Sequence, residues 1–184
     1  MTCVYFISSG QNRLVKDLDN DNINDTVYID AISSKIVCRL STQQFVKMQS
    51  KAIEELNEQS GIVTTKNGFE FYNNWMRAGY RNQFRFSAKE KKIQLIGMSR
   101  YELGNAANDG SGESSVNLLT NDYVGNWNFY HEKKEALIAI PTIKTKLILP
   151  KTHLESFSEE TFFGYAGKCS ALFAKRKDEL LKSK

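Results

Sequence analysis

Hydrophobic and polar residues alternate over many short stretches of this chain, a pattern that is typical of β-strands with one buried side. The alternation is strict from Arg81 to Phe86, where one side of the strand carries Arg81, Gln83 and Arg85 and the other carries Asn82, Phe84 and Phe86. Strands are predicted at residues 2–8, 13–18, 26–32, 35–40, 68–75, 82–87, 92–98, 116–119, 124–130, 135–140 and 142–149.

The alternation gives way to helical spacing at two places. Ser41-Thr42-Gln43-Gln44 fits a capping box and precedes apolar residues at helical intervals, namely Phe45, Met48, Ala52 and Leu56. Ser158 opens a second stretch of this kind, whose apolar stripe consists of Phe162, Ala166, Cys169, Phe173 and Leu180. The sequence therefore predicts one helix in each half of the chain.

The two predicted helices follow similar strands. Residues 32–38 match residues 143–149 in pattern, and a Ser-x-x-x-Phe helix start comes after each of them, at Ser41 and at Ser158. We predict an α+β fold of two similar antiparallel β-sheet units, each closed by a C-terminal amphipathic helix. Residues 1–184 would form one domain of two half-repeats, about 1–60 and 61–184.

One stretch in the middle of the chain, residues 69–98, interleaves aromatic rings with cations. Residues 66–100 contain eight Lys and Arg residues against Glu70 and Glu90, whereas residues 1–60 contain six against eight acidic residues. Such clustering favours a polyanionic partner. We predict a nucleic-acid-binding surface formed by Trp75, Arg77, Tyr80, Arg81, Phe84, Arg85, Lys89 and Lys92, with Trp127 and Tyr130 from a later strand.

The chemistry expected of that surface is non-enzymatic. Cations neutralise phosphates, and aromatic faces stack on unpaired bases. The sequence has no P-loop, no dinucleotide-binding glycine pattern and no nucleophile elbow, and neither predicted helix has a basic face suited to a DNA groove. We therefore expect a single-stranded partner, no cofactor and no metal.

Two alternatives stay open at this stage. Exposed Trp, Tyr and Arg residues are also typical of protein-binding hot spots, so the chain is alternatively a protein-binding inhibitor or immunity-type module. Glu132-x-Lys134 beside a metal would instead suit a metal-dependent nuclease. The two histidines of the chain, His131 and His153, lie on separate segments.

An acidic run near the start resembles a calcium loop in one respect only. Asp17, Asp19 and Asp21 occupy alternate positions, but Asn22 and Tyr28 stand where an EF-hand loop needs its glycine and its bidentate glutamate. A polar hairpin turn is the interpretation that the residues favour.

The bulk properties fit an ordinary globular protein. The chain has 184 residues, of which 41% are hydrophobic and 25% charged, with a formal net charge of +4. Its three cysteines are widely spaced and indicate neither a disulfide framework nor a zinc site. Without a signal-peptide pattern or a long apolar run, we expect a cytoplasmic protein with no membrane association.

The order of the predicted elements resembles a known group of proteins. Two copies of a strand-rich unit ending in a helix are similar to the Whirly and mitochondrial RNA-binding proteins and, more distantly, to the PUR-type proteins. The resemblance covers most of the chain and lies in element order and size. It implies curved antiparallel sheets that bind single-stranded DNA or RNA, and helices that assemble a homo-oligomer.

Overall fold

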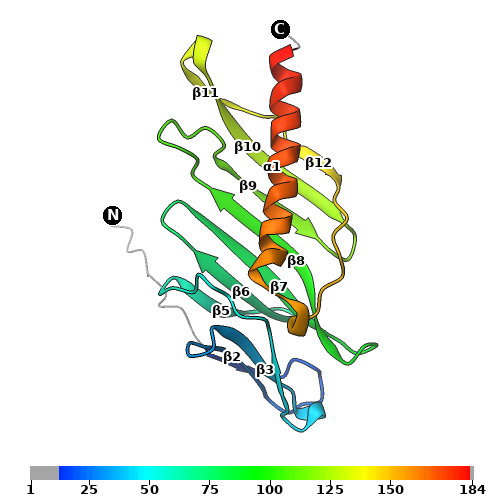
Figure 1. Cartoon of the computed structure of the whole chain (residues 1–184). Helices are drawn as coiled ribbons and strands as arrows, with labels where there is room; N and C mark the ends of the chain where they lie inside the picture. The colour runs from blue at the N-terminus through cyan, green and yellow to red at the C-terminus, as the bar shows by residue number, and fades with distance from the viewer. Residues whose placement is uncertain (1–12, 183–184) are drawn as a thin grey trace, which may run out of the picture.

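The structure is a computed structural model that describes residues 13–182, so the strand predicted at residues 2–8 lies outside the described part. Two antiparallel sheets and one long C-terminal helix make up an α+β fold (Figure 1). None of the helices between residues 13 and 182 has the length and apolar character needed to cross a membrane.

The first sheet is a four-stranded antiparallel meander. Its strands follow one another in chain order and are β1 (Arg13–Lys16), β2 (Asp25–Asp30), β3 (Lys35–Arg39) and β4 (Lys47–Gln49). The sheet packs beside the first strand of the second sheet and lies at the lower end of the molecule in Figure 1.

The second sheet has eight strands and runs β11-β10-β9-β8-β7-β6-β5, with β12 pairing with the other half of β10. Its strands are β5 (Ser60–Thr65), β6 (Gly68–Asn74), β7 (Ala78–Ser87), β8 (Lys92–Glu102), β9 (Gly112–Asn117), β10 (Asp122–His131), β11 (Ala136–Ala139) and β12 (Ile143–Lys146). Short 3-10 helices at η1 (Ser41–Gln43), η2 (Glu132–Lys134) and η3 (Leu154–Ser156) interrupt the connections.

Helix α1 (Glu159–Lys182) crosses one face of the eight-stranded sheet, as Figure 1 shows. It begins directly after Ser158, and Glu159 and Glu160 in its first turn suit the positive end of the helix dipole. Phe162, Tyr165 and Cys169 recur at helical spacing and are buried. The predicted C-terminal helix and its apolar stripe are therefore confirmed.

The core is continuous across both sheets and the helix. The ring of Phe162 stacks on that of Tyr80 in β7, with centroids 4.0 Å apart and planes inclined by 18°. Phe84 lies between Phe69 of β6, at 5.2 Å, and Phe157, at 5.2 Å, just before the helix. Aromatic pairs in such arrangements add to the free energy gained by burying their area.

The prediction of a helix at residues 41–56 is wrong, because this stretch forms the 3-10 turn η1 and the strand β4. Gln44 and Phe45 have positive φ angles, 54° and 57°, which end the short 3-10 turn η1. The Ser41 hydroxyl donates to Asp21 instead of capping a helix, and Met48 pairs with Cys38 of β3. Pairing with β3 buries Met48 and thus overrides the local helical pattern. Among the described residues, only the second sheet has an α-helix.

Most predicted strands are present, with shifted ends. Strand β7 begins at Ala78, before the predicted start at residue 82, and β5 was not predicted at all. Strand β9 likewise begins at Gly112, before the predicted start at residue 116. Strands β7 and β8 form a hairpin across residues 88–91, and a β-bulge at Gln83/Phe84 offsets their register.

Phe84 provides a direct test of this core. Replacing the fully buried ring by Phe84→Ala removes its contacts with Phe69 and Phe157 and should lower the free energy of unfolding by about 3–5 kcal/mol. Lys89→Ala, at an exposed position of the β7–β8 turn with no ion pair among the described residues, is the control and should change it by less than about 0.5 kcal/mol. Urea denaturation measures both, and equal small effects would contradict the packing described.

A cluster of charged groups connects the β7–β8 turn to the segment before η3. Lys151 Nζ donates to Glu90 Oε1, and His153 Nε2 lies 2.6 Å from Glu90 Oε2. The hydrogen bonds from Lys151 and then His153 lower the pKa of Glu90 from its ordinary value. A carboxylate whose pKa is lowered by folding stabilises the folded state most when it is ionised.

The sign of the pH effect follows from that lowered pKa. The contribution of Glu90 is complete above its unfolded pKa of about 4.3 and disappears as the pH falls through the lower folded-state pKa. We expect Glu90→Gln to lower the melting temperature at pH 7 and to lower it by less near pH 3, which lies about one unit below the unfolded pKa. Thermal unfolding followed by circular dichroism compares them; an equal difference at both pH values would argue against this role.

Candidate functional site

Three of the predicted base-stacking residues are part of the core. Tyr80, Phe84 and Trp127 have exposed fractions of 1%, 0% and 3% and lie on the side of the sheet that α1 covers. Burial raises the pKa of the Tyr80 hydroxyl above its ordinary value, in keeping with an interior position. The prediction that these three rings bind a ligand is therefore corrected, because rings packed under the helix are not accessible.

Trp75 is partly buried for the same reason. Its ring lies 5.4 Å from Tyr80 and 6.0 Å from Phe162, between centroids, at the rim of the aromatic core. The sequence showed which residues share a side of each strand, but it did not show which side meets the helix. The side of the sheet that the helix covers determines whether each aromatic ring of the predicted surface is buried or exposed.

Arg77 holds a loop instead of facing an open surface. Its Nε donates to the carbonyl of Gly104 at 3.0 Å, and its Nη2 donates to those of Leu103, at 3.2 Å, and Asn105, at 3.1 Å. Three carbonyl acceptors satisfy most of the donors of one guanidinium. Arg77 is thus engaged by the connection between β8 and β9.

The other side of the sheet is not covered by the helix, and we call it the open face. Directly paired residues point to the same side of a sheet, so the register places one row of side chains across it: Tyr72, Arg81, Ser99, Ser115 and Val124. A second row consists of Glu70, Gln83, Gly97, Asn117 and Asp122. Arg81 and Arg85 of the predicted site lie on this face, and Tyr130 of β10 shares it by parity.

Two tyrosines that sequence reasoning missed lie flat on the open face. A Cβ on Gly61 would stand 2.4 Å from the hydroxyl of Tyr72, and one on Gly79 would stand 2.6 Å from the ring of Tyr101. Each ring therefore lies over a glycine of the neighbouring strand, and Tyr101 also donates to Asn74 at 3.3 Å. Only the strand register reveals these pairs, since Tyr101 and Gly79 are 22 positions apart.

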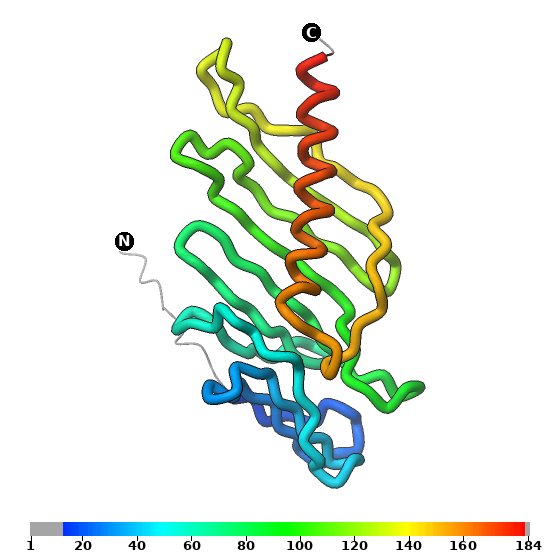
Figure 2. The backbone as a smooth tube through the Cα atoms, viewed as in Figure 1, coloured from blue at the N-terminus to red at the C-terminus, as the bar shows by residue number. Residues whose placement is uncertain are grey.

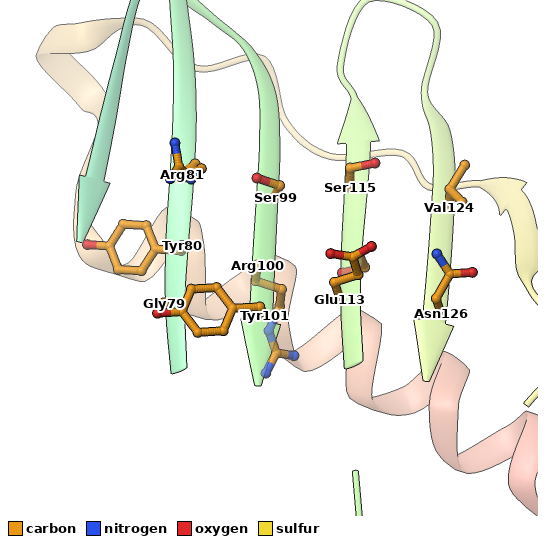
Figure 3. A pocket seen from close by; sticks show the side chains of 11 residues that line it. Gly79, Tyr80, Arg81, Ser99, Arg100, Tyr101, Glu113, Ser115, Val124 and Asn126 are labelled. Atoms are coloured by element: carbon orange, nitrogen blue, oxygen red, sulfur yellow. The ribbon is translucent and has the colours of Figure 1, made fainter. Parts of the chain in front are cut away.

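A shallow groove runs along the middle of the open face, and Tyr101 borders it. Two adjoining hollows of about 310 and 230 Å³ share Arg81, Ser99 and Ser115. Small side chains on β8 and β9 form their floor, and Figure 3 shows Glu113, Asn126 and the ring of Tyr101 around the first of them. The groove thus offers one aromatic face together with hydroxyl, amide, carboxylate and guanidinium groups.

The charges of the groove are balanced. Arg81 Nη1 forms an ion pair with Glu70 Oε1 at 2.7 Å and lies over the ring of Tyr72, and Lys146 pairs with Asp122 at 2.6 Å. Within the described part of the chain, Arg85 and Glu113 have no ion-pair partner. The centre of the open face is therefore polar but close to neutral.

The positive charge gathers at one end of the sheet, where the β5–β6 and β7–β8 turns lie. We call this group the basic end; it consists of Lys66, Arg85, Lys89 and Lys91, all without an ion pair among residues 13–182. Lys92 of the predicted site is nearby but faces Glu155 at 3.9 Å. Glu90 in the same turn is already paired with Lys151 and so does not cancel this charge.

Polar groups under the helix form a separate buried network. The Ser114 hydroxyl lies 2.9 Å from that of Tyr165 and 3.5 Å from the sulfur of Cys169. Trp127 Nε1 donates to the Tyr123 hydroxyl at 3.1 Å, and burial raises the pKa of Tyr123 to about 12. These groups are enclosed between sheet and helix, so their chemistry is structural.

The three aspartates of the early loop do come together. Oxygen atoms of Asp17, Asp19 and Asp21 lie within 4.8 Å of one another. Asp17 accepts from two backbone amides of the loop, Asp21 accepts from the Ser41 hydroxyl, and Asp19 accepts from that of Thr42. The carboxylates thus connect the β1–β2 loop to η1, as the predicted polar turn requires.

The residues proposed for the nuclease alternative lie at a hairpin tip. Glu132 and Lys134 are exposed in η2, between β10 and β11. The acidic cluster of Asp17, Asp19 and Asp21 belongs to the other sheet. Within residues 13–182, the acidic cluster whose oxygen atoms could share a metal ion therefore lies apart from Glu132.

Comparison of the chain with protein-family models, with curated proteins and with solved structures found no match. The likeness to Whirly-type proteins accordingly stays a hypothesis. Any function assigned to this chain has to come from the chemistry of its own surfaces.

The role of Arg77 can be tested directly. Arg77→Ala removes the donors that hold the carbonyls of residues 103–105, so amide hydrogen exchange at residues 107–109 should become about tenfold faster, as expected for the loss of about 1.4 kcal/mol of loop stabilisation. Arg13→Ala, an exposed arginine of β1, is the control and should leave this loop unchanged. Unaltered exchange in Arg77→Ala would show that the loop is held by other contacts.

Proposed function

We propose that this chain is a non-enzymatic protein that binds single-stranded nucleic acid on the open face. The observation that supports this is the combination, on one uncovered sheet surface, of two flat tyrosine rings with the guanidinium groups of Arg81 and Arg85. Sheets with a helix on one side and aromatic residues on the other are a common platform for single-stranded RNA and DNA.

The tyrosine rings supply the stacking surface in this proposal. Tyr72 and Tyr101 each have one side against a glycine of the neighbouring strand, and the guanidinium of Arg81 lies over the Tyr72 ring, so it would have to move aside for a base to stack there. Base stacking on such a ring contributes about 1–3 kcal/mol per base and tolerates any sequence. These two residues replace Tyr80, Phe84 and Trp127 as the stacking residues, and Tyr130 remains a further one.

The groove beside Tyr101 would hold base edges. Carboxylates accept hydrogen bonds from the amino group of cytosine, and amides pair with adenine in the same manner that they use in DNA grooves. Glu113, Gln83 and Asn126 are exposed there. A nucleic-acid strand lying along β8 and β9 would therefore meet the ring of Tyr101 together with these polar groups.

The phosphates would run toward the basic end. Lys66, Arg85, Lys89 and Lys91 are not consumed by ion pairs with other described residues, so they are free to release counterions from a polyanion. Arg81 would have to exchange Glu70 for a phosphate, which makes it a weaker contributor than its position suggests. DNA and RNA are equally compatible with this chemistry.

A protein-binding role is the second candidate, and the balanced charge of the groove favours it. Among the described residues, the ion pairs of Arg81 with Glu70 and of Lys146 with Asp122 suit a polar protein surface as well as a nucleic acid. The two candidates differ in their dependence on salt, because counterion release makes nucleic-acid affinity fall steeply as the ionic strength rises.

Fluorescence anisotropy with labelled single-stranded and duplex oligonucleotides at two salt concentrations tests the proposal. We expect preferential binding of the single strand, weakened by Tyr72→Ala or Tyr101→Ala by about 5- to 150-fold each, which corresponds to 1–3 kcal/mol. Arg85→Ala should flatten the slope of log affinity against log salt by about 0.7. Tyr72→Phe, which keeps the ring, should bind almost as the wild type does.

Matched controls come from the other sheet. Tyr28→Ala and Arg13→Ala change residues of the same type on β2 and β1, outside the open face, and should leave affinity and salt slope unchanged. If the open-face and control variants behave alike, or if no oligonucleotide binds, the proposal is rejected. Binding of a protein partner with little salt dependence would then favour the second candidate.

A further inference from the structure

A second hollow lies on the opposite side of the sheet from the open face, next to the start of α1. The segment from Leu149 to Ser156 descends alongside the helix, as Figure 2 shows, and leaves a groove of about 350 Å³ between the two. We call it the strap groove. Its volume falls in the lower part of the range for sites that hold small molecules.

The floor of the strap groove is apolar. Leu95 and Met98 of β8 form it together with Leu118, and Leu149 closes one side. Leu95 and Met98 are buried by the fold, while Leu118 and Leu149 are only partly covered. An aliphatic body placed here would complete the burial of these side chains, and each methylene transferred from water contributes to affinity.

Gly164 lines this groove and adds no side chain to it. A Cβ built on Gly164 would have no heavy atom within 4 Å, so the space in front of it is unfilled. Glu160, Gly164 and Lys168 are spaced by four residues and therefore form one stripe of α1 along the groove. A larger residue in the middle of that stripe would project into the hollow.

The two ends of the stripe carry opposite charges. Glu160 and Lys168 are exposed, and neither forms an ion pair with another residue of the described chain. Eight residues of helix separate them by about 12 Å. Lys168 thus favours an anionic group at its end of the groove, and Glu160 disfavours one at the other end.

We propose that the strap groove binds a small amphipathic carboxylate, an unbranched fatty acid of medium chain length, with its carboxylate at Lys168. The alkyl chain would lie over Leu95, Met98 and Leu118 toward the first turn of the helix. There the hydroxyls of Ser158 and Thr161 border the groove. This site is independent of the open face, from which the sheet separates it.

A chain-length series tests the class of ligand. Isothermal titration of the full chain with hexanoate, octanoate and decanoate, each below its critical micelle concentration, should give saturable binding with one site. Affinity should rise about fourfold per added methylene until the groove is full. Decylamine, of the same length with the opposite charge, should bind more weakly than decanoate.

A pair of glycine substitutions tests the location. Gly164→Leu should fill the groove and weaken decanoate binding at least about fifteenfold, the equivalent of two methylene contacts. Gly167→Leu is the matched control, because Gly167 lies on the same helix but outside the groove, and a Cβ there also meets open space. Both substitutions raise the helix propensity by the same amount. The control should leave the affinity unchanged.

A charge reversal tests the orientation. Lys168→Glu should lower the affinity for decanoate and raise that for decylamine, whereas Lys175→Glu, an exposed lysine farther along α1, should do neither. The proposal is overturned if decanoate does not bind saturably, if Gly164→Leu has no effect, or if Gly167→Leu has the same effect. Oligonucleotide binding, measured on the same variants, should not change, so the two sites can fail separately.

Discussion

The packing of α1 against one face of the eight-stranded sheet is the contact on which the rest of this structure depends. Phe162 stacks on Tyr80, and Tyr165 and Cys169 approach Ser114 of β9, so the helix is fixed by an aromatic contact at one point and a polar one at another. Buried aromatic area is a large favourable contribution to folding. Once the helix occupies one face, every strand has a buried side and a free side.

The two faces offer different kinds of binding chemistry. The open face is flat and polar and has tyrosine rings supported by glycine backbone, which suits an extended partner. The strap groove lies between the helix and the neighbouring segment and has an apolar floor, which suits a small ligand with an aliphatic body. Helix α1 covers the face of the sheet opposite the open face, and it also forms one wall of the strap groove.

The long helix and most strands could be predicted because each has a periodicity of its own. The stretch at residues 41–56 shows where such prediction fails: its apolar residues have helical spacing, yet Met48 gains more from pairing with Cys38 than a short isolated helix offers. Strand β5 lacks a clear alternation, and it is defined by its pairing with β6. A pattern within one segment does not report on the partner that segment will find.

The sequence by itself determined which residues share a side of each strand, as Arg81 and Arg85 do, and that the basic residues cluster in the middle of the chain. Only the tertiary structure decided that the side with Tyr80 and Phe84 is buried, and that Tyr72 and Tyr101 lie over glycines of neighbouring strands. The physical reason is that burial and strand register arise from contacts between segments far apart in the chain, and local periodicity is the same whichever face the helix covers.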